Sequence, residues 1–191
     1  MSYVILIPGG FKPPTCAHYR MVKSYSNHPE VKKTYIVQTS HVRERFESHI
    51  TKKVFDIYGG FSERVQYILA EEGSRGAIEK VHKLVNDPDF TSQFSADTIY
   101  ALGVSSKEDD AKRVQNFLNY YEKRPSALQE GITIGPPPFV AKVIGDKEGD
   151  MSSSALRQAL REGDMSLVMR YTRSLAAANF LRNFSISRSL K

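Results

Sequence analysis

The sequence predicts an α/β fold: a doubly wound, mostly parallel sheet of about five strands, followed by a helical C-terminal segment. Short apolar and β-branched runs alternate with longer segments of helical periodicity along the first two thirds of the chain. Such alternation is typical of parallel strands joined by right-handed helical crossovers. From residue 153 onward the pattern is helical throughout.

The individual elements follow from periodicity and from turn residues. Strands are expected at 3–7, 34–39, 65–69 and 98–104, with short candidates at 132–134 and 139–143. Helices are expected at 16–27, 51–58, 77–85, 109–121, 153–161, 166–171 and 175–184. Thr51 is expected to cap the second helix, and Gly59-Gly60 to stop it. This order indicates a Rossmann-like fold.

Length and composition indicate one soluble domain. The chain has 191 residues, 40% of them hydrophobic and 25% charged, which suits a single domain over 1–181 with a basic tail at 182–191. The start lacks the basic region of a signal peptide, and no apolar stretch approaches membrane-spanning length. A single cysteine, Cys16, excludes an internal disulfide. We therefore expect a cytoplasmic protein that does not contact a membrane.

The charge balance favours anionic ligands. A formal net charge of +6 and a pI near 9.3 suit polyanions such as nucleoside triphosphates, although many proteins of the cytosol are mildly basic. Nucleic acid is not expected as a partner. Arg43 and Arg45 either meet an acidic acceptor or form a solvated face.

The stretch at 5–20 has the chemistry of a phosphate site. An apolar strand runs into Gly9-Gly10, and Pro13-Pro14 then favour the start of a helix. Thr15 and His18 are three residues apart, so they share a face in the first helical turn. Backbone N–H groups, the positive end of a helix dipole and two side-chain donors would therefore meet there.

This stretch resembles the first signature, G-x-F-x-P-x-[HT]-x-G-H, of the H-x-G-H class of nucleotidyltransferases. The matching positions are Gly10, Phe11, Pro13, Thr15 and His18. Ala17 stands where the family has glycine, which puts close approach of the nucleotide in doubt. Residues 151–157, M-S-S-S-A-L-R, resemble the second signature, I-S-[GS]-T-x-[IL]-R.

The resemblance implies roles for individual residues. His18 would contact the transferring phosphoryl group, Thr15 would fill the first position of the H-x-G-H element, and Lys12 would reach the acceptor or point to solvent. Nucleotide and phosphate contacts are implied for Gly9, Gly10, Phe11, Ser152, Ser153, Ser154 and Arg157. The alternative is that the serines are only a helix cap, but Arg157 beside them and the first signature favour phosphate binding. Magnesium is implied as a cofactor, held mainly by the triphosphate oxygens.

The loop after the fourth expected strand is a further candidate. Ser105, Lys107 and Asp110 would contact the nucleoside or the acceptor, and a solvated loop is the alternative. Residues 103–110 also resemble the phage-encoded branch of the superfamily, in which case the compartment would be the host cytoplasm or the virion.

Two functions follow. The first is transfer of AMP or CMP from a nucleoside triphosphate to a small phosphorylated acceptor, with release of pyrophosphate. The second is a catalytically weak or inactive protein of this fold that serves as a structural or assembly subunit, for example of a phage particle. Ala17 and the tail motivate the second, since Phe184 and Ile186 could dock on a partner, in a homo-oligomer or a larger assembly. The base, the acceptor and the oligomeric state stay open.

Overall fold

The computed structural model describes residues 1–191 except 107, 143–144, 147–148 and 190–191. Contacts divide the chain into two compact units. The first unit comprises residues 1–9, 21–40 and 62–143, and the second comprises 10–20, 41–61 and 144–191. The expected organisation, one domain over 1–181 followed by a tail, stays a prediction.

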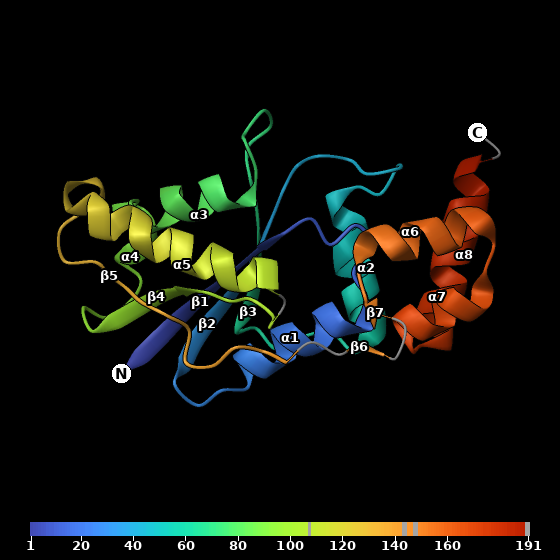
Figure 1. Ribbon diagram of the computed structural model, residues 1–191, viewed down its shortest axis with the longest axis horizontal. Coiled ribbons are helices and arrows are strands. Elements are labelled where there is room, and N and C mark those ends of the chain that lie inside the picture. Colours follow the sequence, from blue (N-terminus) through green and yellow to red (C-terminus); the bar gives the residue numbers. More distant parts are fainter. Residues whose placement is uncertain (107, 143–144, 147–148, 190–191) are drawn as a thin grey trace. The chain divides into compact units, whose positions relative to one another are not determined.

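The first unit contains a five-stranded sheet in which every pairing is parallel (Figure 1). Its strands are β1 (Ser2–Gly9), β2 (Val31–Gln38), β3 (Val65–Leu69), β4 (Thr98–Leu102) and β5 (Thr133–Ile134), in the order β3-β2-β1-β4-β5. The central strand β1 carries four consecutive side chains that are at most 1% exposed, Val4 to Ile7. A strand buried on both faces needs helices on both faces, so the predicted Rossmann-like, doubly wound α/β fold is confirmed.

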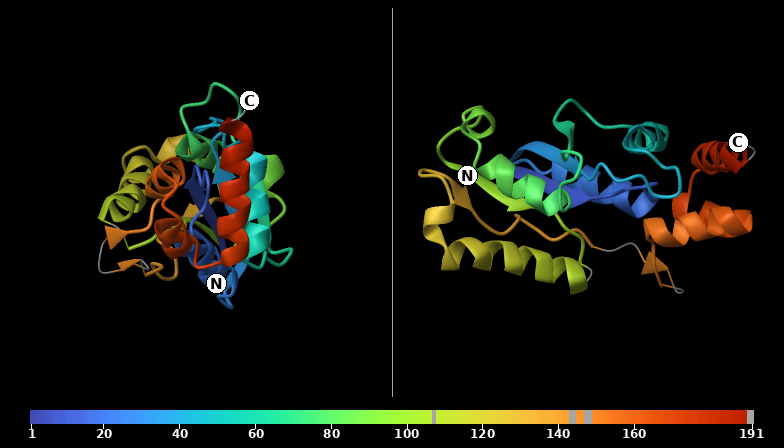
Figure 2. Two further views of the ribbon diagram at one scale, coloured as in Figure 1. Left: turned by 90° about the vertical axis from the view of Figure 1, so that its right-hand side faces the viewer. Right: turned by 90° about the horizontal axis from the view of Figure 1, so that it is seen from above.

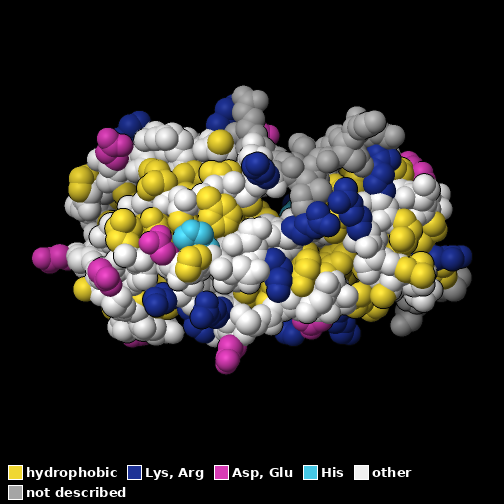
Figure 3. Space-filling view, turned by 90° about the horizontal axis from the view of Figure 1, so that it is seen from below, with side chains coloured by type: hydrophobic (Ala, Val, Ile, Leu, Met, Phe, Trp, Pro, Cys, Tyr) yellow, Lys and Arg dark blue, Asp and Glu magenta, His cyan; other side chains and the backbone are white. Residues whose placement is uncertain are grey.

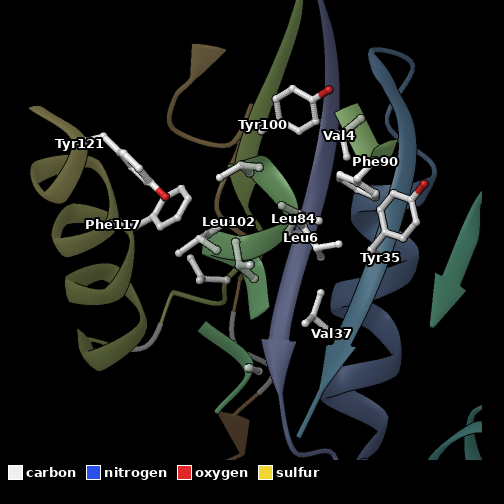
Figure 4. Close-up of a cluster of buried hydrophobic side chains, with 14 residues drawn as sticks. Val4, Leu6, Tyr35, Val37, Leu84, Phe90, Tyr100, Leu102, Phe117 and Tyr121 are labelled. Atoms are coloured by element: carbon white, nitrogen blue, oxygen red, sulfur yellow. The ribbon is translucent and has the colours of Figure 1, made fainter. Parts of the chain in front are cut away.

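One face of the sheet packs against α3 (Ala77–Val85), the short helix α4 (Pro88–Thr91) and α5 (Glu108–Lys123). Figure 4 shows this core, in which Val4 and Leu6 of β1 meet Tyr35, Leu84 and Leu102. Alternation along β1 sends Ile5 and Ile7 to the opposite face. There they lie beside Tyr25 of α1 (Cys16–Ser26) at the position of Gly103.

The second unit is mainly helical. It contains α2 (Ser48–Tyr58), α6 (Ser153–Glu162), α7 (Met165–Thr172) and α8 (Leu175–Ser189), together with the small hairpin β6 (Gly145–Asp146) and β7 (Gly149–Asp150) (Figure 2). Its core joins these helices through buried apolar residues: Phe46, Ile50, Val54, Leu156, Ala159, Val168, Ala178 and Leu181. No helix in the described part of the chain is long and apolar enough to cross a membrane.

Several sequence-based expectations were wrong in detail. Helix α2 starts at Ser48, after Glu47, so Thr51 lies inside the helix rather than at its cap. Residues 139–142 form no strand beyond a bridge between Ser105 and Ala141, and Val143 lies outside the described residues. The hairpin was missed. Helix α4 was also missed, because the Asp87-Pro88 pair that ends one helix also caps the next.

The C-terminal helix is longer than expected. Helix α8 continues to Ser189, so most of the expected tail at 182–191 is helical, whereas the sequence predicted a helix only to about residue 184.

The net positive charge of the sequence appears on the surface. Lys and Arg side chains gather in patches on the face shown in Figure 3.

Gly103 gives a direct test of the packing on the β1 face toward α1. A Cβ at this position would lie 2.6 Å from Ile5 Cγ2 and 2.7 Å from Ile7 Cγ1, both on the central strand. We expect Gly103→Ala to lower the free energy of unfolding by about 1–3 kcal/mol, since a packed sheet cannot shift freely. Gly10→Ala is the matched control because a Cβ there meets no atom within 4 Å. Equal melting temperatures for the two variants in thermal denaturation would contradict this account of the packing.

Candidate functional site

The loop at 11–14 is held by its carbonyl groups. Four consecutive carbonyls each accept a hydrogen bond from a side chain of α2 or α6, all within the second unit. The pairs are Thr51 Oγ1 to Phe11 O (2.6 Å), Arg157 Nη1 to Lys12 O (2.8 Å), Ser153 Oγ to Pro13 O (2.7 Å) and Tyr58 OH to Pro14 O (2.9 Å). We call this arrangement the carbonyl clamp. It joins the two sequence signatures, which lie about 140 residues apart.

The carbonyl clamp holds a backbone that has little support of its own. Pro13 and Pro14 have no N–H to donate, and Phe11 has a positive φ of 52°, which costs a residue other than glycine about 1–2 kcal/mol. Each hydrogen bond in the clamp contributes about 0.5–1.5 kcal/mol net, so four of them offset that cost. The loop conformation therefore depends on side chains supplied by α2 and α6.

The clamped loop leads into the helix that carries His18. The backbone N–H of Thr15 donates to Nδ1 of His18 over 3.0 Å, so in the neutral imidazole Nδ1 is the acceptor and Nε2 carries the proton. Thr15 Oγ1 lies 3.4 Å from the His18 amide, at the cap of α1. The ring of His18 meets the Phe11 ring edge-on, with centroids 5.1 Å apart. Thr15 and Phe11 thus fix both the tautomer and the orientation of His18.

Lys12 is a buried cation, 1% exposed. Its Nζ donates to the carbonyl of His41 over 2.5 Å. Burial, and then the positive charge of Arg43, lower the pKa of Lys12 to about 8. A desolvated ammonium of this kind interacts strongly with any anion that reaches it.

Arg157 is the second cation tied to the loop. Besides its bond to Lys12 O, its Nη2 donates to Ser154 Oγ over 3.2 Å. Burial lowers the pKa of its guanidinium, and the Glu44 carboxylate raises it again. Its Nε is buried and has no hydrogen-bond partner among the described residues, with Glu44 Oε1 3.9 Å away. Such an unsatisfied donor costs about 1–3 kcal/mol.

The three serines of the second signature have structural partners. Ser152 is the N-cap of α6 and accepts from the amide of Ala155 over 3.1 Å, so the helix-cap interpretation is confirmed for this residue. Ser153 belongs to the carbonyl clamp, and Ser154 accepts from Arg157. Their predicted contacts to phosphate stay predictions.

A tight turn at 43–46 places the carboxylate of Glu44 near Arg157 and Arg161. Arg43 and Phe46 exchange two backbone hydrogen bonds, and the central residues Glu44 and Arg45 have φ values of 49° and 71°. Positive φ at both central positions is the geometry of a type I′ turn, which normally requires Asn or Gly. Glu44 accepts a short hydrogen bond from Arg161 Nη1. Sequence analysis gave no role to Glu44 or Arg161.

Gly9 and Gly10, which follow each other at the end of β1, have different surroundings. Gly9 ends β1, where it pairs with Gln38. Gly10 has no positive φ, and a Cβ there would meet no atom within 4 Å, so neither packing nor backbone geometry in the protein requires glycine at this position. Space beside Gly10 is compatible with a ligand that approaches the backbone closely.

The loop after β4 belongs to the first unit. Ser105 Oγ donates to Asp110 Oδ2 over 2.5 Å, which closes the loop onto the start of α5. Tyr25 OH donates to Val104 O over 2.6 Å and accepts from Val104 N. Lys107 lies outside the described residues. The predicted nucleoside or acceptor contacts of Ser105, Lys107 and Asp110 stay predictions.

Cys16 has no features of a nucleophile. It is 6% exposed, burial raises its thiol pKa, and its Sγ lies 3.5 Å from Met151 Sδ. A position in the first turn of a helix can lower a thiol pKa, but here loss of hydration outweighs that effect.

The roles of Thr51 and Tyr58 in the clamp were not predicted from the sequence, which gave Thr51 only as a helix cap. The two residues are seven positions apart on α2 and so lie on one helix face, a spacing that could have marked a shared polar function. The described residues contain no group of three or more His, Cys, Asp or Glu side chains that could hold a metal ion. The donors around the clamped loop are cations and N–H groups, which fit phosphate oxygens rather than a metal.

Comparison with known proteins identifies the fold. No protein-family model matches the sequence, and no curated protein matches it. Two solved structures of Plasmodium falciparum nicotinic acid mononucleotide adenylyltransferase are similar to this chain, one complexed with APC (TM-score 0.53) and one with NaAD (TM-score 0.54). Each is 14% identical, and each match covers 96% of both chains. The chain therefore shares the fold of these two structures over nearly its whole length.

The carbonyl clamp can be tested at Thr51, which is fully buried. Thr51→Val keeps the shape of the side chain but leaves the Phe11 carbonyl without its donor, so we expect the free energy of unfolding to fall by about 1–3 kcal/mol. Thr51→Ser, which keeps the hydroxyl, should lose less. Chemical denaturation measures both variants, and a Val variant as stable as wild type would show that the hydroxyl does not hold the loop.

Proposed function

We propose that the chain is a nucleotidyltransferase that transfers AMP or CMP from a nucleoside triphosphate to a small phosphorylated acceptor, with release of pyrophosphate. The fold of the solved adenylyltransferases and the two sequence signatures support this proposal. Since both similar structures are adenylyltransferases, AMP is the group that we favour.

The observation that carries the proposal is the fixed orientation of His18. Because Thr15 N–H donates to Nδ1, the neutral imidazole carries its proton on Nε2 and presents an N–H there. Phosphoryl transfer needs donors that are already oriented before charge develops on the transferring group. A histidine that is locked in one tautomer at the start of a helix supplies such a donor.

In the proposed reaction an oxygen of the acceptor phosphate attacks the α-phosphorus of the triphosphate. The bond from the α-phosphorus to the bridging oxygen breaks, and pyrophosphate leaves with the electron pair. The acceptor oxygen is already ionised at neutral pH, so no general base is needed. His18 would donate to the α-phosphoryl oxygens, while Lys12 and Arg157 would neutralise charge on the outer phosphates.

Magnesium is proposed to arrive with the triphosphate. Among the residues that the structure describes, no group of three or more carboxylate, His or Cys side chains could cage the ion. Magnesium bound by phosphate oxygens and water would reduce the charge of the triphosphate. The protein would contribute only donors and cations.

A structural role is the second candidate. Two side chains of the second signature, Ser153 and Arg157, already donate to carbonyls of the clamped loop. Ala17 also departs from the glycine of the family. Both observations favour a protein in which the signature residues maintain the fold for an assembly function, with weak activity or none.

Isothermal titration with ATP and CTP, each with magnesium, separates the two candidates. We expect one nucleotide to bind, and His18→Ala to weaken its Kd by at least about tenfold, because a hydrogen bond to a charged group is lost. His49→Ala is the matched control, since the side chain of His49 is 54% exposed and is not part of the loop or signature. Pyrophosphate release with candidate acceptors follows once binding is found.

The opposite results are equally clear. If neither ATP nor CTP binds at millimolar concentration, the catalytic proposal is wrong and the assembly role is favoured. Equal affinity of His18→Ala and His49→Ala would remove His18 from the site.

Lys12 makes nucleotide binding depend on pH. In the free protein the pKa of Lys12 is lowered to about 8, and a bound triphosphate would raise it. The charged form therefore binds better, and affinity for ATP should fall as pH rises, by up to about tenfold between pH 7 and 9. Lys12→Met should remove most of this dependence. A wild-type Kd that is constant over this range would show that Lys12 does not face the phosphates.

A further inference from the structure

A cleft of about 930 Å³ lies within the second unit, beside the residues discussed above. The 43–46 turn, the C-terminal half of α6 and the C-terminal part of α8 line it. It lies along the far end of α6 from the serine cap, at Leu160 to Gly163, and Arg157 forms part of its wall. A volume of this size is typical of sites for small organic molecules.

One side of the cleft carries arginines. Arg161 donates to Glu44. The buried Nε of Arg157 lies 3.9 Å from the same carboxylate and has no hydrogen-bond partner among the described residues. The Glu44–Arg161 pair is about half exposed, with 44% and 54% of the side chains accessible. It therefore contributes little to stability, and another anion can replace Glu44 on Arg161. A ligand anion with two oxygens can engage Arg161 and Arg157 Nε together, in place of Glu44.

The other side of the cleft is apolar. Phe46 stacks on Phe184 with ring centroids 5.0 Å apart, and Leu160 lies nearby in the same lining. Ile186 is 47% exposed, so α8 offers apolar surface to a molecule in the cleft. A cleft with one apolar wall and one wall of arginines suits a ligand that has both an apolar part and a negative charge.

We propose that this cleft binds a small amphipathic organic anion. The anionic group, a carboxylate or a phosphate monoester, takes the place of Glu44 on Arg161 and Arg157. An aromatic or aliphatic body lies on Leu160, Phe184 and Ile186. The inference does not rest on the proposed function, although Arg157 is common to both and would couple them.

Amide NMR titration with 1-naphthyl phosphate and with 1-naphthoate tests the proposal and separates the two anion types. We expect shifts confined to 44–46, 160–163 and 184–186, with saturation by at least one of the probes. Inorganic phosphate alone should bind at least about tenfold more weakly, since it lacks the apolar body. Shifts that fall instead on 10–18 and 152–155 would mean that the probe takes the proposed nucleotide site, and would overturn the inference.

Matched variants define the contacts. Arg161→Met should weaken the Kd of the bound probe by about tenfold or more, while Arg182→Met, an exposed arginine of α8 outside the lining, should not. Glu44→Gln should tighten binding about threefold, because the internal competitor is removed. Glu162→Gln is its control, since that carboxylate accepts from Gln158 rather than from an arginine.

His18→Ala keeps the cleft intact, so it should bind the probe as wild type does whether or not the protein binds nucleotides. An unchanged Kd in Arg161→Met, or equal effects of Glu44→Gln and Glu162→Gln, would overturn the assignment.

Discussion

The site depends on how a loop with few backbone donors is held in place. Two prolines remove N–H groups from the stretch before α1, so the protein fixes it through its carbonyl oxygens instead. Thr51, Tyr58, Ser153 and Arg157 supply the four donors. The orientation of His18, the burial of Lys12 and the position of Arg157 all follow from this one arrangement. The loop thus takes its local geometry from side chains of two helices in the second unit, α2 and α6.

Local signals in the sequence predicted most of the fold. The parallel sheet, its main strands and nearly all helices follow from periodicity, because burial imposes a spacing of two or of 3.6 residues on the chain itself. The partners of polar side chains could not be predicted in this way. Thr51 illustrates the limit: a hydroxyl near a helix start suggests a cap, yet its acceptor is the carbonyl of Phe11, 40 residues away. The serines show the same limit, since three adjacent residues of one type have three different partners.

Two cations of the second unit, Lys12 and Arg157, are partly removed from water. Lys12 is buried with a lowered pKa, and Arg157 keeps a buried N–H that no described residue accepts. The strained turn at Glu44 and Arg45 brings one carboxylate toward this excess of positive charge. One carboxylate cannot neutralise Lys12, Arg157 and Arg161 together, so binding of a further anion is favourable. Both proposed ligands, a triphosphate and a smaller amphipathic anion, draw on that property.

The burial of Cys16 has a practical consequence for chemical labelling. Its thiol is the sole one in the sequence and is packed against Met151, with a raised pKa, so maleimide and iodoacetamide reagents will reach it slowly in the folded protein. A cysteine introduced at an exposed position, for example Ile186→Cys on α8, can therefore be labelled selectively without removal of the native residue. Fluorophores or spin labels attached in pairs at two such positions would report distances within the folded chain, and Cys16 would not need to be replaced first.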